Sequence, residues 1–154
     1  MTGTIFYDSS SAEEIPPEAR YAAVYVNGYV TPAAQVRRFT GGVFRISVLP
    51  EAYWARLARC IDVERGAATP ADARAFITER HALGKGDATV YCSRLAIPAV
   101  QAACEGLDYR IWAADWTGVP HEVPGAWAVQ FATVAGKYDE SVVSGDADFC
   151  HPQE

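Results

Sequence analysis

Apolar segments recur along the chain at short intervals, separated by polar stretches that contain Gly and Pro. Most of these segments are near-continuous hydrophobic runs with weak alternation, which is the pattern of strands buried on both faces. The pattern predicts seven strands and indicates a short eighth one near the end of the chain. The predicted strands cover residues 4–7, 22–26, 42–48, 59–63, 88–92, 109–113, 126–131 and 141–143.

Helical signals lie between several of the predicted strands. Thr69, Pro70 and Asp72 form a capping box with proline at the first helical position. The helix that starts there is expected to end at Gly84, because glycine commonly follows the last helical turn. A second helix is predicted at 97–105, and a helix or a single turn is predicted at 51–58 and at 31–39.

The alternation of strands and helices predicts an α/β fold with a mainly parallel sheet. Seven or eight strands with short connections favour a closed (β/α) TIM-like barrel. The chain has 154 residues, whereas such barrels usually need about 200 or more. We therefore expect a trimmed barrel over 1–143, with helices reduced to loops mainly after strands six and seven, followed by a polar tail over 144–154.

Composition and charge narrow the range of partners. The net charge is −6, and the 13 Lys and Arg residues form no block, which argues against nucleic acid and anionic membranes. The sequence contains no apolar run long enough to cross a bilayer, and its start lacks the basic and apolar regions of a signal peptide. We expect a protein made in the cytoplasm that acts elsewhere only after lysis, release through a holin, or assembly into a particle.

The cysteines give no sign of a metal site. Cys60, Cys92, Cys104 and Cys150 form no C-x-x-C pair, and no histidine lies at a ligand spacing from them. They are expected to be reduced and mostly buried. We predict no metal and no cofactor.

The segment 60–65 carries the strongest chemical signal. As a strand it places Ile61 and Val63 on one face and Asp62 and Glu64 on the other. Two adjacent carboxylates repel each other, and burying them unpaired costs several kcal/mol or raises the pKa of one of them. Hydrolysis of a glycosidic bond uses such a pair, with one carboxyl protonated and its neighbour ionised. The alternative is a solvated strand end with two surface acids.

Other acids are expected at the same end of the barrel. Catalytic groups of such barrels lie where parallel strands end. Asp8 ends the first predicted strand, Asp115 follows the sixth, and Asp139 precedes the last short one. We therefore expect these three acids to converge with Asp62 and Glu64 at one mouth.

Aromatic residues share these strand ends. Flat rings beside acids suit a sugar, because its C–H groups can lie on the ring while its hydroxyls face the carboxylates. Trp112 and Trp127 could equally be core residues, whereas Trp116, in a polar loop, is predicted to be an exposed platform. The full set is Tyr91, Trp112, Trp116, Trp127 and Phe131.

In this order and spacing, the residues resemble the family-25 glycoside hydrolases, the lysozymes of phages and bacteria that cut peptidoglycan, and related glycoside-hydrolase-like domains. The similarity extends over roughly 5–143, although the chain is shorter than the family usually is. The matching elements are Asp8 after strand one, Asp62-Val63-Glu64 on strand four, Tyr91 on strand five, Trp112 in a W-I-A-like element, Gln130 in a W-Q-Y-like strand with Trp127 displaced, and Asp139 as the closing acid.

The resemblance implies hydrolysis of the β-1,4 bond between N-acetylmuramic acid and N-acetylglucosamine. It implies that Glu64 is the general acid, that Asp62 raises its pKa and stabilises positive charge or orients the substrate, and that Asp8 and Asp139 fix the geometry. The partner would be the peptidoglycan glycan strand, reached at the bacterial cell wall after release or from within a virion. The residues expected to bind this substrate are Tyr91, Asp115, Trp112, Trp116 and Gln130.

Two other functions fit the same pattern. One is a non-catalytic member, either a glycan-binding barrel or a tail-associated component with partners in a phage particle. The other is an unrelated cytoplasmic α/β enzyme whose acids hold Mg²⁺. The sequence shows no phosphate-binding loop, since Gly84-Lys85-Gly86 is too short. His81, His121 and His151 are expected at the surface.

Overall fold

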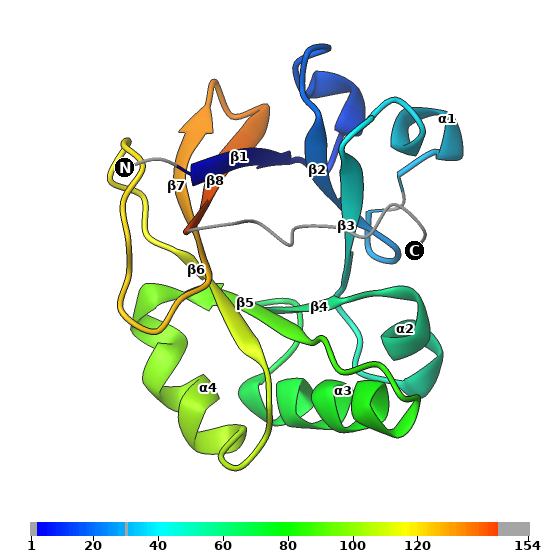
Figure 1. Ribbon diagram of the computed structural model, residues 1–154, viewed down its shortest axis with the longest axis vertical. Helices are drawn as coiled ribbons and strands as arrows, with labels where there is room; N and C mark the ends of the chain where they lie inside the picture. Colours follow the sequence, from blue (N-terminus) through cyan, green and yellow to red (C-terminus); the bar gives the residue numbers. More distant parts are fainter. Residues whose placement is uncertain (1–2, 30, 145–154) are drawn as a thin grey trace.

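The computed structural model describes residues 3–29 and 31–144 and shows a closed barrel of eight strands in sequence order (Figure 1). The predicted tail, except for its first residue, and Cys150 lie outside the described residues. All eight predicted strands are present, most within two residues of the expected bounds. They are β1 (Gly3–Asp8), β2 (Tyr21–Tyr25), β3 (Gly42–Ser47), β4 (Cys60–Val63), β5 (Thr89–Ser93), β6 (Arg110–Ala114), β7 (Ala128–Val134) and β8 (Tyr138–Ser144).

The barrel is mixed. Neighbouring strands from β1 to β7 pair in parallel, as predicted, but β8 is antiparallel to both β7 and β1. A tight turn explains this direction. Ala135 and Gly136 have φ values of 54° and 66°, and the Lys137 N–H donates to the Val134 carbonyl at 3.0 Å. Positive φ at both central positions is the geometry of a hairpin turn, which joins antiparallel strands.

The hairpin corrects the predicted position of Asp139. The sequence analysis placed this residue before the last strand, but it lies inside β8, opposite Asp8 of β1. Strand β8 is longer than predicted because it also pairs with the outer half of β7, as far as Val134.

Helices are few and lie mainly on one side. Figure 1 shows α2, α3 and α4 together beside β4 and β5. The described residues contain no helix between β6 and β7 or between β7 and β8, which confirms where the reduction was expected. No helix in the described ranges is long and apolar enough to cross a membrane. The helices are α1 (Ala33–Val36), α2 (Ala52–Leu57), α3 (Pro70–Ala82) and α4 (Ile97–Ala103), with short 3₁₀ turns at Ala12–Glu14 and Arg94–Ala96.

The N-terminus of α3 confirms the predicted capping box. The Thr69 hydroxyl accepts a hydrogen bond from the Asp72 N–H at 3.2 Å, and the Asp72 carboxylate accepts one from the Thr69 N–H at 2.9 Å. These two bonds satisfy backbone donors that have no partner within the helix. The helix is followed by Gly84 with φ +74°, a conformation that favours glycine.

Successive residues of β4 point alternately to the outside and to the inside of the barrel, so the strand contributes to two separate hydrophobic clusters. Ile61 and Val63 pack in a cluster with Phe76 of α3 on the outside of the barrel. Cys60 belongs to a cluster inside the barrel, where Phe6 and Trp112 pack with their ring centroids 5.1 Å apart. Cys60, Cys92 and Cys104 are buried free thiols, as expected. Asp62, on the same side of β4 as Cys60, is therefore directed toward the barrel interior at its mouth.

Candidate active site

Strand register brings the predicted acids to one end of the barrel. Asp8 lies at the end of β1 and directly opposite Asp139 of β8. Asp62, near the end of β4, is paired in register with Tyr91 of β5. Because β1, β4 and β5 run in the same direction around the barrel, these side chains share its C-terminal mouth.

Asp62 is a buried acid with an altered titration. Its side chain is 1% exposed, and its Oδ2 accepts a hydrogen bond from the Tyr25 hydroxyl at 2.9 Å. Burial, followed by the nearby charge of Glu64, raises the pKa of Asp62 to about 7, and the Tyr25 hydrogen bond opposes this rise. Its Oδ1 is buried without a hydrogen-bond partner among the described residues. Asp62 can therefore hold a proton near neutral pH.

Glu64 differs from Asp62 in its exposure. It follows the last residue of β4 and is exposed. It lines a groove of about 560 Å³ together with Tyr91 and Trp116. The two acids thus form an asymmetric pair, with one carboxyl buried and the other accessible to a ligand in the groove.

Gln130 connects the two sides of the site. Its Nε2 donates to Asp8 Oδ1 at 3.0 Å and to Asp139 Oδ2 at 3.3 Å. Its Oε1 accepts hydrogen bonds from the Tyr91 hydroxyl and from Trp116 Nε1, both at 2.9 Å. An amide can make both kinds of bond at once, whereas a carboxylate would have no donor for the two acids. Gln130 is 1% exposed, so it holds these four side chains in place from beneath.

Asp8 and Asp139 also titrate away from their ordinary range. Burial, followed by the charge of Asp139, raises the pKa of Asp8 well above its ordinary value, although the Gln130 hydrogen bond opposes the rise. Burial likewise raises the pKa of Asp139. The mouth of the barrel therefore carries less negative charge at weakly acidic pH than its number of acids suggests.

Of the predicted aromatic residues, Tyr91 and Trp116 line the groove, whereas the other three pack within the protein or against its cores. Trp116 is 60% exposed, as expected of a platform. Trp112 is 1% exposed, and its Nε1 donates a hydrogen bond to Ser141 Oγ at 3.0 Å. Its ring packs against the Tyr91 ring with the two centroids 4.7 Å apart. A side chain this buried supports Tyr91 from inside the barrel and offers no surface to a ligand. Phe131 belongs to the core outside the barrel, and the half-buried Trp127 packs against the cluster inside it.

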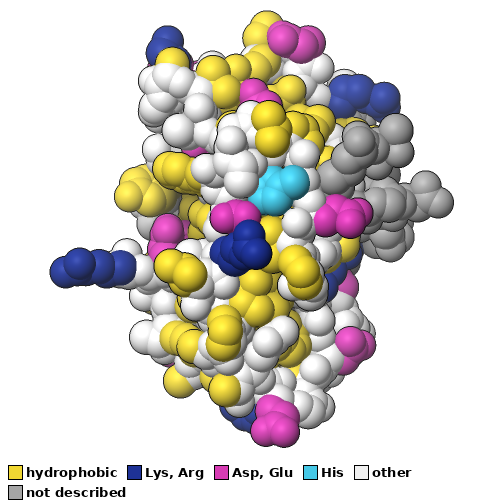
Figure 2. Space-filling view, turned by 90° about the vertical axis from the view of Figure 1, so that its left-hand side faces the viewer, with side chains coloured by type: hydrophobic (Ala, Val, Ile, Leu, Met, Phe, Trp, Pro, Cys, Tyr) yellow, Lys and Arg dark blue, Asp and Glu magenta, His cyan; other side chains and the backbone are white. Residues whose placement is uncertain are grey.

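Asp115 takes part in a different set of contacts. Its Oδ2 pairs with Arg94 Nη1 at 2.9 Å and with His121 Nε2 at 2.8 Å. Hydrogen bonds from His121 and then Arg94 lower the pKa of Asp115. Figure 2 shows the face made by α4 and the β6–β7 loop, where acidic, basic and histidine side chains lie together among apolar ones. Asp115 thus anchors the loop that carries Trp116: its N–H donates to the Gln130 carbonyl at 2.9 Å, while its carboxylate pairs with Arg94 and His121 and not with the Gln130 side chain.

The sequence analysis missed Tyr25, Arg94 and His121. Tyr25 ends a parallel strand, so its position alone could have placed it at the mouth. The partnership of Arg94 and His121 with Asp115 depends on loop geometry that no sequence pattern reveals. His151, the third predicted surface histidine, lies outside the described residues.

No protein-family model matches this chain, and no curated protein matches it either. Among residues 3–29 and 31–144, His, Cys, Asp and Glu side chains form no group of three that could hold a metal ion. The site is therefore described by its geometry alone. It consists of an acid pair at the mouth of a closed barrel, beside a groove lined by two aromatic side chains.

Proposed function

We propose that the protein is a glycosidase that hydrolyses the β-1,4 bond between N-acetylmuramic acid and N-acetylglucosamine in peptidoglycan. In this proposal it is a trimmed relative of the (β/α)₈ barrels of family-25 lysozymes. The observation that carries the proposal is the asymmetric acid pair. Burial raises the pKa of Asp62 to about 7, while Glu64 beside it faces the groove.

The proposed chemistry follows from accessibility. A general acid must reach the glycosidic oxygen, and Glu64 is the member of the pair that lines the groove. Glu64 gives its proton to the leaving oxygen as the bond from that oxygen to the sugar C1 breaks. A water molecule then adds to C1 and returns a proton to the pair, so that each fragment ends with a hydroxyl group. The proton held by Asp62 passes to Glu64 and replaces the one that Glu64 has given away. The ionised Asp62 then stabilises the positive charge that develops at C1, and it takes back the proton that the water releases.

The surroundings of the pair suit a glycan. The exposed Trp116 ring and the Tyr91 hydroxyl lie on the same groove as Glu64. Apolar sugar faces stack on such rings. Gln130 fixes Tyr91 and Trp116 through one carbonyl oxygen, so their relative position does not have to be ordered when the glycan binds. The site of action in this proposal is the bacterial cell wall, reached after release or from a phage particle.

The test compares the protein with its Glu64→Gln variant on purified peptidoglycan. New reducing ends are measured from about pH 4 to about pH 8, the range in which carboxyl pairs titrate. We expect release by the unaltered protein and a loss of at least about a hundredfold in Glu64→Gln, since general acid catalysis contributes about that much or more. Glu105→Gln is the matched control, because Glu105 is an exposed acid after α4.

The remaining outcomes separate the alternatives. Release that is equal in Glu64→Gln and in the unaltered protein would contradict the assigned role of Glu64. If neither protein releases fragments but both sediment with peptidoglycan, and Trp116→Ala abolishes sedimentation, the barrel is a glycan-binding module. If it neither cuts nor binds, the glycan proposal fails and a structural role in a particle becomes the better explanation.

A further inference from the structure

The long loop between β6 and β7 forms part of the wall of the groove. It covers residues 115–127 and carries Trp116, which lines the groove. The neighbouring part of the wall comes from Ser93 and Ala96, at the 3₁₀ turn that follows β5. The position of the loop relative to this turn therefore sets the shape of the groove on this side.

Asp115 and His121 connect these two segments. Asp115 Oδ2 lies 2.9 Å from Arg94 Nη1, in the 3₁₀ turn, and 2.8 Å from His121 Nε2, farther along the loop. His121 also closes the loop on itself, because its Nδ1 lies 2.9 Å from the Val119 carbonyl oxygen and 3.0 Å from Thr117 Oγ1. The His121 side chain is 22% exposed, so these contacts form where water is partly excluded.

Both ring nitrogens of His121 face an oxygen that can only accept a hydrogen bond. The Val119 carbonyl has no proton to give. Hydrogen bonds from His121 and then Arg94 lower the pKa of Asp115, so its carboxylate has none either. A neutral imidazole carries a single N–H and would leave a nitrogen lone pair against one of the two oxygens, whereas an imidazolium donates to both. The geometry therefore selects the protonated ring, which is no general base for the neighbouring Thr117 hydroxyl.

The titration of His121 agrees with this geometry. Hydrogen bonds to the Val119 carbonyl and then to Asp115 raise the pKa of His121 above its ordinary value of 6.5. The charged groups that act on the ring are Asp115, from its own loop, which raises the pKa, and Arg94, from the 3₁₀ turn, which lowers it. The contribution of these contacts to stability is therefore full below about pH 6.5 and is lost as pH rises through the raised pKa.

We propose that His121 is a positioning residue of the groove: as an imidazolium it holds the loop of Trp116 against the 3₁₀ turn, and a glycan binds more tightly than after the ring has lost its proton. The inference rests on the proposed function for the kind of ligand. The bond from Trp116 to Gln130 does not involve His121, so loss of the proton is expected to loosen the wall without removing the aromatic platform. A glycan must then order the wall as it binds, which lowers its affinity.

The test measures how the affinity for a soluble tetrasaccharide of alternating N-acetylglucosamine and N-acetylmuramic acid depends on pH. Two proteins are titrated by tryptophan fluorescence, and both carry Glu64→Gln so that the ligand is not cut. One keeps the natural histidine and the other has His121→Gln. With the histidine, affinity should fall by at least about fivefold more between about pH 5.5 and about pH 9 than it does in His121→Gln. Asp62 titrates in both proteins, so the difference between them isolates His121.

A second measurement separates positioning from simple support of the fold. Binding and protonation are reciprocal, so a ligand that favours the imidazolium must raise the pKa of His121 further. The ring resonances of His121 report this pKa by NMR in the free and the saturated protein, and they are assigned by their absence in His121→Gln. A histidine that only supports the fold would keep the same pKa when the glycan binds.

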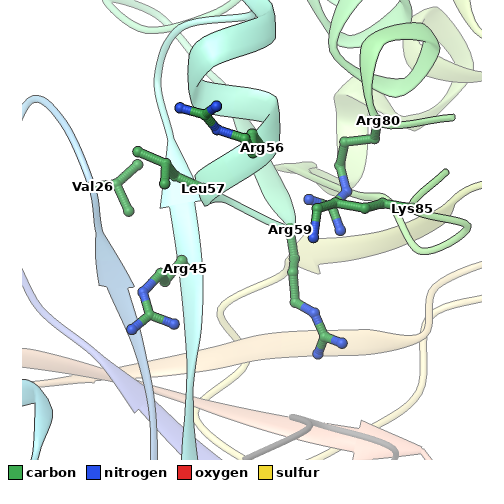
Figure 3. A pocket seen from close by; sticks show the side chains of 7 residues that line it. All are labelled: Val26, Arg45, Arg56, Leu57, Arg59, Arg80 and Lys85. Atoms are coloured by element: carbon green, nitrogen blue, oxygen red, sulfur yellow. The ribbon is translucent and has the colours of Figure 1, made fainter. Parts of the chain in front are cut away.

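The matched control is His81→Gln. His81 lies in the last turn of α3, next to Arg80, which donates to the Ala58 carbonyl just before β4 begins. His81 is therefore at the end of the barrel opposite the mouth. Figure 3 shows Arg80 and Lys85 lining a separate pocket of about 430 Å³. The pH dependence of affinity should be the same in this control as in the protein with both histidines.

The outcomes distinguish this inference from the proposed function. Equal pH dependence with and without His121, or a His121 pKa that does not rise on saturation, would overturn the inference and leave the glycosidase proposal intact. Absence of binding at every pH up to about 10 mM ligand would also overturn it, while release of reducing ends from peptidoglycan would still decide the glycosidase proposal. If binding shows the expected pH dependence but no reducing ends are released, the inference holds for a glycan-binding groove and the glycosidase proposal fails.

Discussion

Replacing Asp62 by asparagine should stabilise the protein increasingly as pH rises. The pKa of Asp62 is raised from 3.8 to about 7 by burial and then by the charge of Glu64. A raised acid pKa means that the folded state binds the proton more tightly than the unfolded chain does. Asp62 therefore favours folding at low pH, and this contribution is lost as pH rises through the folded pKa. Asparagine has no such charge to bury.

The size of the effect follows from the two pKa values. The difference between 3.8 and about 7 corresponds to about 4 kcal/mol at pH values above 7, since each pKa unit is worth about 1.4 kcal/mol. Below about pH 4 both states hold the proton, and the difference in stability between the two proteins should become constant. Any steric or hydrogen-bonding effect of the extra amide protons adds an offset that does not vary with pH.

Urea unfolding of both proteins, followed by tryptophan fluorescence at several pH values from about 4 to about 8, measures this difference. We expect the free energy of unfolding of Asp62→Asn to gain on that of the unaltered protein by about 4 kcal/mol across this range. A difference that stays constant with pH, or moves in the opposite direction, would refute the conclusion that Asp62 is a buried acid with a raised pKa. The same variant should lose the proposed hydrolysis, because its stored proton is gone.

Other substitutions test the same structure at separate points. Tyr25→Phe removes the hydrogen bond that favours the ionised carboxylate, so the pKa of Asp62 should rise above about 7, measured by carboxyl carbon NMR; a lower value would contradict the assigned direction. Asp87→Asn should destabilise the protein more at neutral pH than at about pH 3. The pKa of Asp87 is lower in the folded protein than in the unfolded chain, so its carboxylate favours folding at neutral pH, and this contribution is lost as pH falls through the folded pKa. Urea unfolding at the two pH values checks the sign. Arg80→Met removes a buried cation that is bonded to the α2 carbonyls and to Asp87, and should cost about 3–5 kcal/mol in urea unfolding; a loss under about 1 kcal/mol would show that these bonds do not hold α2 in place. Gly136→Ala places a Cβ at φ +66° and should cost about 1–2 kcal/mol, whereas the exposed Gly86, whose φ is not positive, should tolerate alanine far better.

Local pattern accounts for the elements and for the direction of many side chains. Near-continuous apolar runs predicted the strands, because a strand covered on both faces buries successive residues. Thr69 and Asp72 predicted the start of α3, since their bonds involve residues only three apart. Alternation along β4 placed Asp62 on the side opposite Ile61 and Val63 for the same local reason. The antiparallel last strand was missed, although Gly136 lies at the turn that sets its direction.

The partners of each site residue could not be obtained in this way. Tyr25 and Asp62 are 37 positions apart, and Gln130 and Asp8 are 122 apart. Which side chains meet over such distances depends on strand order, register and barrel closure, and these depend on the packing of the whole chain. The sequence analysis therefore expected five acids to converge, namely Asp8, Asp62, Glu64, Asp115 and Asp139. The fold made Gln130 the buried link between Asp8 and Asp139 and paired the Asp115 carboxylate with Arg94 and His121 instead. Residue type and local spacing specify what a side chain can do chemically, but hydrogen bonds and burial arise between distant segments, and only their packing determines which acid holds a proton.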